Sequence, residues 1–179
     1  MNYVVDAGVA LKWFVDEPLR AAALRLLNPR LALHAPDLLL AQMGEILRRK
    51  LQRSEIGSEQ AQQALRQAPV YFECLHPAQH MHERALQLSL KLELPVADCF
   101  YLACADLLKA TLVTADAELA VKAARAAFDD KRWCGLSPKQ RKLMMQRFAE
   151  LMRLNTGIST TNNTHHTHKN ENKKKNSTN

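Results

Sequence analysis

Three isolated aspartates follow or begin predicted structural elements, at positions where their carboxylates could act together. Asp6 follows the apolar residues 3–5, and Asp116 follows the β-branched run at residues 111–113, which is predicted as a short buried strand. Asp98 falls in the first turn of a predicted apolar helix. Parallel strand ends and the helix starts beside them face one crevice, where ligands bind. Three carboxylates meeting there would repel one another without a cation between them, which favours a hard divalent metal, Mg²⁺ or Mn²⁺.

Each aspartate, taken alone, also has an ordinary structural explanation. Asp6 suits the turn after a strand, Asp98 suits a helix start where the macrodipole favours an acid, and Asp116 suits a helix N-cap. Their shared placement at the ends of elements nevertheless favours one common site over three unrelated caps.

Composition limits the class of protein. The chain has 179 residues with 47% hydrophobic content, enough for one domain with a proper core. No apolar run reaches membrane-spanning length and no basic segment precedes the first strand, so we expect no signal peptide, no membrane association and a cytoplasmic location. A Ser/His/Asp set in plausible order, a phosphate-binding glycine loop and a dinucleotide fingerprint are all missing, which excludes the commoner rival enzymes.

The net charge of +7 is spread unevenly along the chain. Residues 1–130 carry 14 basic and 16 acidic side chains, residues 131–154 carry 7 basic and 1 acidic, and residues 155–179 carry 4 basic and 1 acidic. We therefore predict three parts: a slightly acidic domain at 1–130, a basic amphipathic helical extension at 131–154 and a disordered polar tail at 155–179. A nucleic-acid argument from positive charge applies only to the C-terminal part.

Hydrophobic patterning predicts an alternation of strands and helices. Strands are expected at residues 3–5, 31–34, 70–72 and 111–113. Helices are expected at residues 19–27, at 36–53, after a Ser58 cap, at 78–92 and around Asp98. This alternation is typical of an α/β fold with a mostly parallel sheet. Trp13, Cys99 and Cys104 are predicted as core residues and Lys12 as part of the core's rim.

Four short blocks of sequence resemble the PIN domain family, in particular the VapC toxins of bacterial toxin–antitoxin pairs. The blocks are Val5-Asp6-Ala7, Ala35-Pro36-Asp37-Leu38-Leu39, Val96-Ala97-Asp98 and Leu112-Val113-Thr114-Ala115-Asp116. The resemblance covers roughly residues 1–127 and implies a PIN-like three-layer fold, with a central mostly parallel sheet flanked by helices. It also implies a Mg²⁺- or Mn²⁺-dependent ribonuclease that is a homodimer, acts on RNA and is neutralised by a cognate antitoxin.

Carried over by position, Asp6, Asp98 and Asp116 match three metal-site acids of the family, but two other positions depart from it. Gly8 stands where the family usually has Ser or Thr. Gln42 stands where the family has a Glu, and Glu45 stands three residues later in place of an Asn. An amide cannot supply a carboxylate's charge.

Because residues three apart on a helix share a face, Glu45 is a candidate to replace the missing acid as a catalytic residue. The competing interpretation makes Glu45 a solvated helix-face residue paired with Arg48 or Arg49.

Two functions therefore stay open on the sequence. The first is an active metal-dependent ribonuclease toxin, which the three aspartates favour. The second is a catalytically impaired relative that retains RNA or antitoxin binding, which Gln42 and Gly8 favour.

Overall fold

The structure is a computed structural model that describes residues 2–129, 137–139 and 142. Its chain divides into two compact units, Met1–Ala126 and Ala127–Asn179. The predicted extension at 131–154 and the predicted tail at 155–179 lie outside the described residues, apart from 137–139 and 142. Both stay predictions.

A four-stranded parallel sheet forms the centre of the first unit. Its strands are β1 (Asn2–Val5), β2 (Ala32–Pro36), β3 (Cys74–His76) and β4 (Thr111–Val113), in the spatial order β3-β2-β1-β4. All three strand pairings are parallel, with Val4 opposite His34 on one side and Leu112 on the other. The predicted α/β class with a mostly parallel sheet is thus confirmed.

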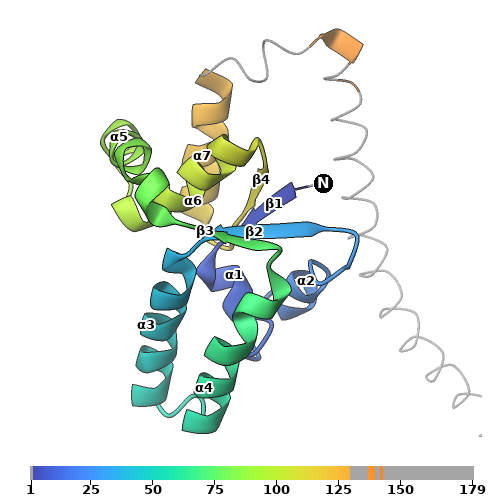
Figure 1. Cartoon of the computed structure of the whole chain (residues 1–179), viewed down its shortest axis with the longest axis vertical. Helices are drawn as coiled ribbons and strands as arrows, with labels where there is room; N and C mark the ends of the chain where they lie inside the picture. Colours follow the sequence, from blue (N-terminus) through green and yellow to red (C-terminus); the bar gives the residue numbers. More distant parts are fainter. Residues whose placement is uncertain (1, 130–136, 140–141, 143–179) are drawn as a thin grey trace, which may run out of the picture. The chain divides into compact units, whose positions relative to one another are not determined.

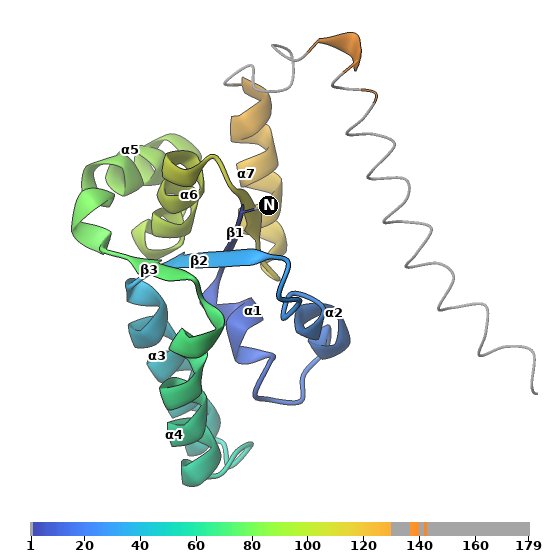
Figure 2. The same ribbon diagram turned by 45° about the vertical axis from the view of Figure 1, so that its right-hand side comes forward.

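Helices cover both faces of this sheet and complete the three predicted layers (Figures 1 and 2). One face carries α1 (Ala7–Leu11), α2 (Arg20–Leu24), α3 (Leu38–Gln52) and α4 (Ser58–Gln67). The other carries α5 (His82–Leu92), α6 (Val96–Leu108) and α7 (Ala117–Asp129). Single 3₁₀ turns, Ala68–Tyr71 and Ala78–His80, flank β3. In the described residues, no helix is both long enough and apolar enough to cross a membrane.

Three local predictions are wrong, each for a physical reason. Residues 70–72 are not a strand, because Pro69 opens the 3₁₀ turn Ala68–Tyr71 and the strand starts only at Cys74. Ser58 is the first helical residue of α4 rather than its cap; Gly57, with extended backbone, occupies the N-cap. The strand Thr111–Val113 is not fully buried, since it lies at the edge of the sheet with Thr111 exposed.

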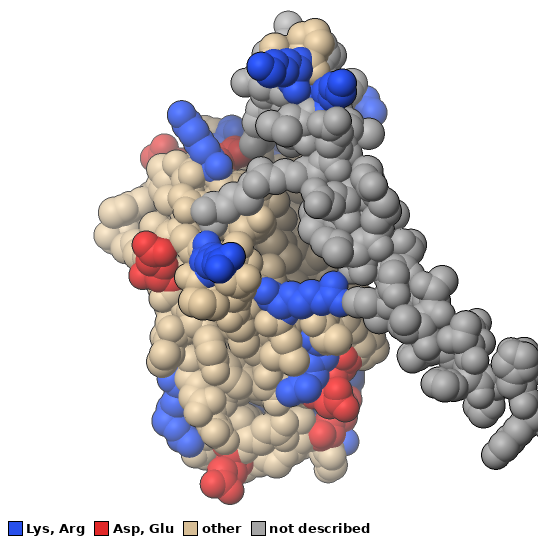
Figure 3. Space-filling model, turned by 90° about the vertical axis from the view of Figure 1, so that its right-hand side faces the viewer, with Lys and Arg blue, Asp and Glu red and all other residues tan. Residues whose placement is uncertain are grey.

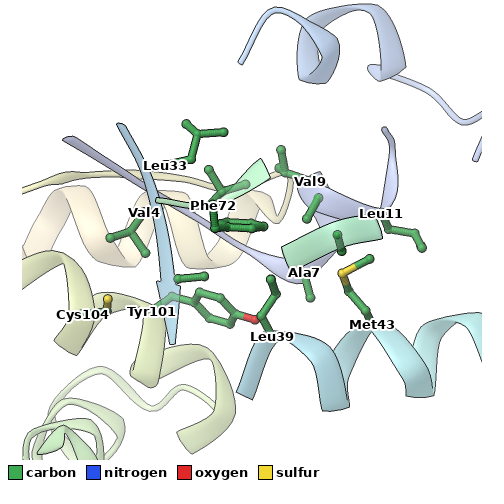
Figure 4. Packing of buried hydrophobic residues seen from close by; sticks show 14 of the residues in the cluster. Val4, Ala7, Val9, Leu11, Leu33, Leu39, Met43, Phe72, Tyr101 and Cys104 are labelled. Carbon is green, nitrogen blue, oxygen red and sulfur yellow. The ribbon is translucent and has the colours of Figure 1, made fainter. Parts of the chain in front are cut away.

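Side chains from the sheet, α1, α3 and α6 fill the core between the layers (Figure 4). Tyr101 of α6 is buried and extends toward Leu39 of α3. Trp13 is only 5% exposed and its indole Nε1 donates to the carbonyl of Ala23 at 3.0 Å. Cys99 and Cys104 are buried free thiols, so these predicted core positions are confirmed.

Candidate active site

A pocket of about 420 Å³ brings together residues from the first and last parts of the first unit. It is lined by Asp6, Ala7, Gly8, Gln42, Glu45, Ile46, Arg49, Asp98, Tyr101, Ala115, Asp116 and Leu119. All four acids singled out from the sequence line it. They come from the β1–α1 turn, α3, α6 and the β4–α7 turn, so the parallel strand order β2-β1-β4 is what makes them neighbours.

Asp6 is the most constrained acid of the pocket. It is the N-cap of α1, and its Oδ1 accepts from the backbone N–H of Val9 at 2.6 Å. The hydroxyl of Thr114 and the backbone N–H of Ala115 also donate to its carboxylate. Burial raises the pKa of Asp6, these three hydrogen bonds oppose the rise, and the charge of Asp116 adds to it. The carboxylate is therefore held in one orientation at the end of β1.

Asp98 sits in the first turn of α6, which begins directly after Pro95. The side chain is half-buried, and burial is the largest cause that raises its pKa. The charges of Asp116, Asp6 and Glu118 raise the pKa further, in that order. Asp98 therefore experiences the negative charge of its neighbours directly.

Asp116 joins β4 to α7. Its Oδ1 accepts from the backbone N–H of Leu119 at 2.9 Å, and its own backbone N–H donates to the hydroxyl of Thr114 at 2.9 Å. Asp116 is thus a helix cap, as the ordinary explanation of the sequence predicted, and it also lines the pocket with Asp6 and Asp98. The role of Asp116 as a helix cap and its place in the acidic pocket are therefore compatible.

The donor set of the pocket suits a hard divalent cation, but no finished coordination shell is present. Carboxylate oxygens are the ligands that Mg²⁺ and Mn²⁺ prefer. Burial, followed by the charges of Asp116 and Asp6, raises the pKa of Asp98, and a cation would remove the repulsion between these carboxylates. Within the residues that the structure describes, however, no three His, Cys, Asp or Glu side chains are arranged to hold a metal ion. The chemical type of these ligands nevertheless fits the metal.

The α3 wall of the pocket carries a fork-shaped ion pair. Arg48 donates from Nε and Nη2 to the two carboxylate oxygens of Glu45 at 2.8 and 2.7 Å, while Arg49 lies 3.8 Å from Glu45. The Arg48 hydrogen bonds lower the pKa of Glu45. Glu45 is half-exposed and paired along its helix, as one interpretation of the sequence predicted, and it lines the pocket as well.

Gln42, which stands in place of the family's acid, is oriented by Tyr101. The Tyr101 hydroxyl donates to Gln42 Oε1 and accepts from the backbone N–H of Ala7. Burial, followed by the charge of Asp6, raises the pKa of Tyr101, which therefore remains a neutral donor. At the other departure, a Cβ added to Gly8 would lie 3.5 Å from Asp6 Oδ1, an ordinary contact. A Cβ at this position would therefore cause no clash.

Three residues near the site were not predicted as functional. Arg49 and Tyr101 line the pocket, and Glu118 acts electrostatically on Asp98. A signal for Arg49 existed: it lies seven residues after Gln42, two helical turns along the same face. For Tyr101, only the tertiary contacts of its hydroxyl with Gln42 of α3 and Ala7 of α1 reveal the role.

This fold and this pocket define a class of protein. The PIN domain family model matches residues 3–125, and the chain belongs to the PIN domain family. The chain is 33% identical over 119 residues to ribonuclease VapC1 of Mycobacterium tuberculosis, in strains CDC 1551 / Oshkosh and ATCC 25618 / H37Rv. That match covers 65% of this chain and 87% of VapC1.

A solved structure supports the fold independently. The crystal structure of PAE2754 from Pyrobaculum aerophilum matches with a TM-score of 0.53 and 22% sequence identity, over 68% of this chain and 79% of that one. The resemblance inferred from the short sequence blocks is therefore confirmed.

Proposed function

We propose that the protein is a metal-dependent endoribonuclease, the toxin of a VapC-type toxin–antitoxin pair. The observation that carries the proposal is the convergence of Asp6, Asp98 and Asp116 on one pocket, where two of them raise the pKa of the third. Repelling carboxylates of this kind are relieved by a divalent cation. The similarity to ribonuclease VapC1 supports RNA as the substrate.

In this proposal Asp6, Asp98 and Asp116 hold Mg²⁺ or Mn²⁺. When bound, such a metal lowers the pKa of a water and stabilises charge on a phosphate. Asp6 supplies the fixed part of the site, because three donors orient its carboxylate. Asp98 supplies a second acid, whose charged form is disfavoured by burial and then by the charges of its neighbours, so that a bound cation would favour it.

Glu45 is proposed as the fourth, catalytic acid, placed one turn from Gln42 on the α3 wall. Its carboxylate stays ionised because Arg48 lowers its pKa.

The proposed partners are RNA, a cognate antitoxin protein and a second copy of the chain in a homodimer. The similarity to VapC1 supports the first two. Because the proposed substrate is cellular RNA, we place the activity in the cytoplasm.

The second candidate function is a catalytically impaired relative that binds RNA or an antitoxin without cutting RNA. Gln42 favours it, because the amide is neutral and its oxygen is already bonded to Tyr101. Gly8 favours it as well, because it brings no hydroxyl to Asp6.

One experiment separates the two functions. Purified protein with Mg²⁺ or Mn²⁺ is expected to cleave structured RNA, with complete loss in excess EDTA. Asp98→Asn keeps the shape of the side chain, removes its charge and is expected to lower the rate by a factor of about 100 or more. The unfolding midpoint of Asp98→Asn is expected to be no lower than that of the wild type, because the amide removes a charge that burial and the neighbouring carboxylates disfavour. Equal cleavage with and without EDTA would exclude the metal mechanism, and no cleavage by the wild type would establish the impaired relative.

A further inference from the structure

The pocket poses an electrostatic problem for an RNA substrate. Four carboxylates line it, and each repels a phosphate. On the face drawn in Figure 3, described charged side chains of both signs are scattered among uncharged surface. Of the pocket-lining residues in the described part of the chain, Arg49 alone carries a positive charge.

The pairing on α3 leaves the Arg49 guanidinium weakly engaged by its nearest acid. Both oxygens of Glu45 bond to Arg48 at 2.7 and 2.8 Å, whereas the contact from Glu45 to Arg49 is 3.8 Å, beyond hydrogen-bond length. The Arg49 side chain is 57% exposed, so it has room to turn toward an anion. Because Arg48 bonds both carboxylate oxygens of Glu45, Glu45 forms only a long ion pair with Arg49.

Helix geometry places Arg49 at a distance from the aspartates. Gln42 accepts from the Tyr101 hydroxyl and lines the pocket with the three aspartates, so this part of α3 borders the aspartates. Arg49 is seven residues further along α3, about 10 Å at the rise of an α-helix. A phosphate bound by Arg49 would therefore not be the reacting phosphate at the aspartates. It would be a nearby phosphate of the same RNA strand.

We propose that Arg49 binds a backbone phosphate that flanks the scissile position, and that the Arg48–Glu45 fork keeps it available for this contact. The proposal rests on RNA being the substrate, as proposed above. In this role Arg49 contributes to the affinity for RNA and fixes the position of the strand in the pocket, while the aspartates contact the reacting phosphate. A guanidinium suits this role because its fork of donors matches two phosphate oxygens and its charge is permanent.

The test measures RNA binding separately from cleavage. Full-length wild type, Arg49→Gln, Arg49→Lys and Arg53→Gln are titrated against a fluorescein-labelled RNA hairpin of mixed sequence, in EDTA, at several salt concentrations. Arg53 is the matched control, because it ends the same helix, is 72% exposed and does not line the pocket. Arg49→Gln is expected to weaken binding about tenfold and to reduce the salt slope of log K by about 1. Arg49→Lys is expected to retain the slope, and Arg53→Gln to change neither quantity.

Three results would overturn the proposal. The first is equal binding by Arg49→Gln and Arg53→Gln, the second is a loss of affinity with an unchanged salt slope, and the third is a wild type that does not bind the hairpin in EDTA. Matching circular dichroism spectra establish that the variants are folded. Failure of the proposed function looks different: the wild type then binds RNA and shows the Arg49 effect, but does not cleave it with Mg²⁺.

Discussion

At the scale of single residues, two aspartates have a structural role and a proposed chemical role at once. Asp6 and Asp116 each accept a backbone hydrogen bond at the start of a helix, at 2.6 and 2.9 Å. These bonds use one carboxylate oxygen and fix the direction of the other. Capping thus removes side-chain freedom that an uncapped ligand would lose on binding a metal.

The role of Glu45 is decided by two substitutions. If Glu45 replaces the family's acid, Glu45→Gln is expected to lose nearly as much metal-dependent cleavage as Asp98→Asn, a fall in rate by a factor of about 100. If the protein is an impaired relative, Glu45→Gln changes little, and Gln42→Glu raises cleavage by restoring a carboxylate beside Tyr101. The helix tolerates both changes, since Glu and Gln have similar helix propensities. Cleavage rates of wild type and both variants are compared; an active wild type matched by an equally active Glu45→Gln shows that the three aspartates suffice.

Tyr101→Phe tests the hydroxyl that links α6 to α1 and α3. Its removal leaves Gln42 Oε1 and the Ala7 N–H without this partner in a buried place, and is expected to lower the free energy of unfolding by about 1–3 kcal/mol. Urea titration measures the loss. Tyr71→Phe, at a 41% exposed tyrosine, is the control and is expected to stay within about 0.5 kcal/mol of the wild type. Equal effects of the two variants would contradict a structural role for the Tyr101 hydroxyl.

At the scale of elements, a network of ion pairs connects the C-terminal end of α3 to the segment that follows α1. Glu17 is bonded by Lys12 at 2.8 Å and by Lys50, which also bonds Glu55 at 2.7 Å. Lys12 and Lys50 are largely buried, with side chains 12% and 14% exposed. Predicted from the sequence only as a rim residue, Lys12 thus belongs to a network that sets where α3, and with it the α3 wall of the pocket, is held.

This network predicts a specific pH dependence. Burial alone would raise the pKa of Glu17, but the hydrogen bonds from Lys12 and Lys50 outweigh it, so the folded-state pKa lies below the ordinary value of 4.5. The stabilisation is therefore complete above that value and is lost as the pH falls through the lower, folded-state pKa.

Glu17→Gln is expected to cost about 1.5–3 kcal/mol at neutral pH, and the difference from the wild type is expected to shrink at about pH 3. Urea unfolding at the two pH values measures both. Glu59→Gln, in the first turn of α4, serves as the surface control. A Glu17→Gln deficit that is the same at both pH values would contradict the assignment.

At the scale of the whole chain, the family's domain and the positive charge occupy different regions. The PIN domain match ends at residue 125, while residues 131–179 carry 11 basic and 2 acidic side chains. The buried hydrophobic cluster of the described residues runs from Val4 to Leu119. Folding and RNA attraction are thus expected to be separable.

A chain ending at residue 130 tests this separation. It is expected to unfold cooperatively with the wild-type midpoint, since the described core is retained. Its RNA affinity at low salt is expected to fall about tenfold or more, because a net charge of −2 replaces +7. A chain ending at residue 154, which keeps the basic extension, is the control and is expected to bind nearly as the wild type. Loss of cooperative unfolding would refute the boundary at 130, and unchanged affinity would refute the role of the extension.

Local patterns were enough to predict much of this protein. The apolar runs before Asp6 and Asp116 predicted β1 and β4, the apolar pattern from Asp98 onward predicted α6, and strand–helix alternation predicted the parallel sheet. These features depend on near neighbours in the chain, which is why the sequence determines them. The convergence of three aspartates also followed from them, because parallel strands end at one edge.

Tertiary structure alone decided the features that depend on which elements meet. The exposure of β4 depends on its place at the sheet edge. Similarly, the partner of Gln42 is a tyrosine 59 residues away. The fork between Arg48 and Glu45 was foreseeable from their spacing, but its consequence for Arg49 was not. It required knowing that this face of α3 borders the aspartates, which the packing of α3 against α1 and β2 determines.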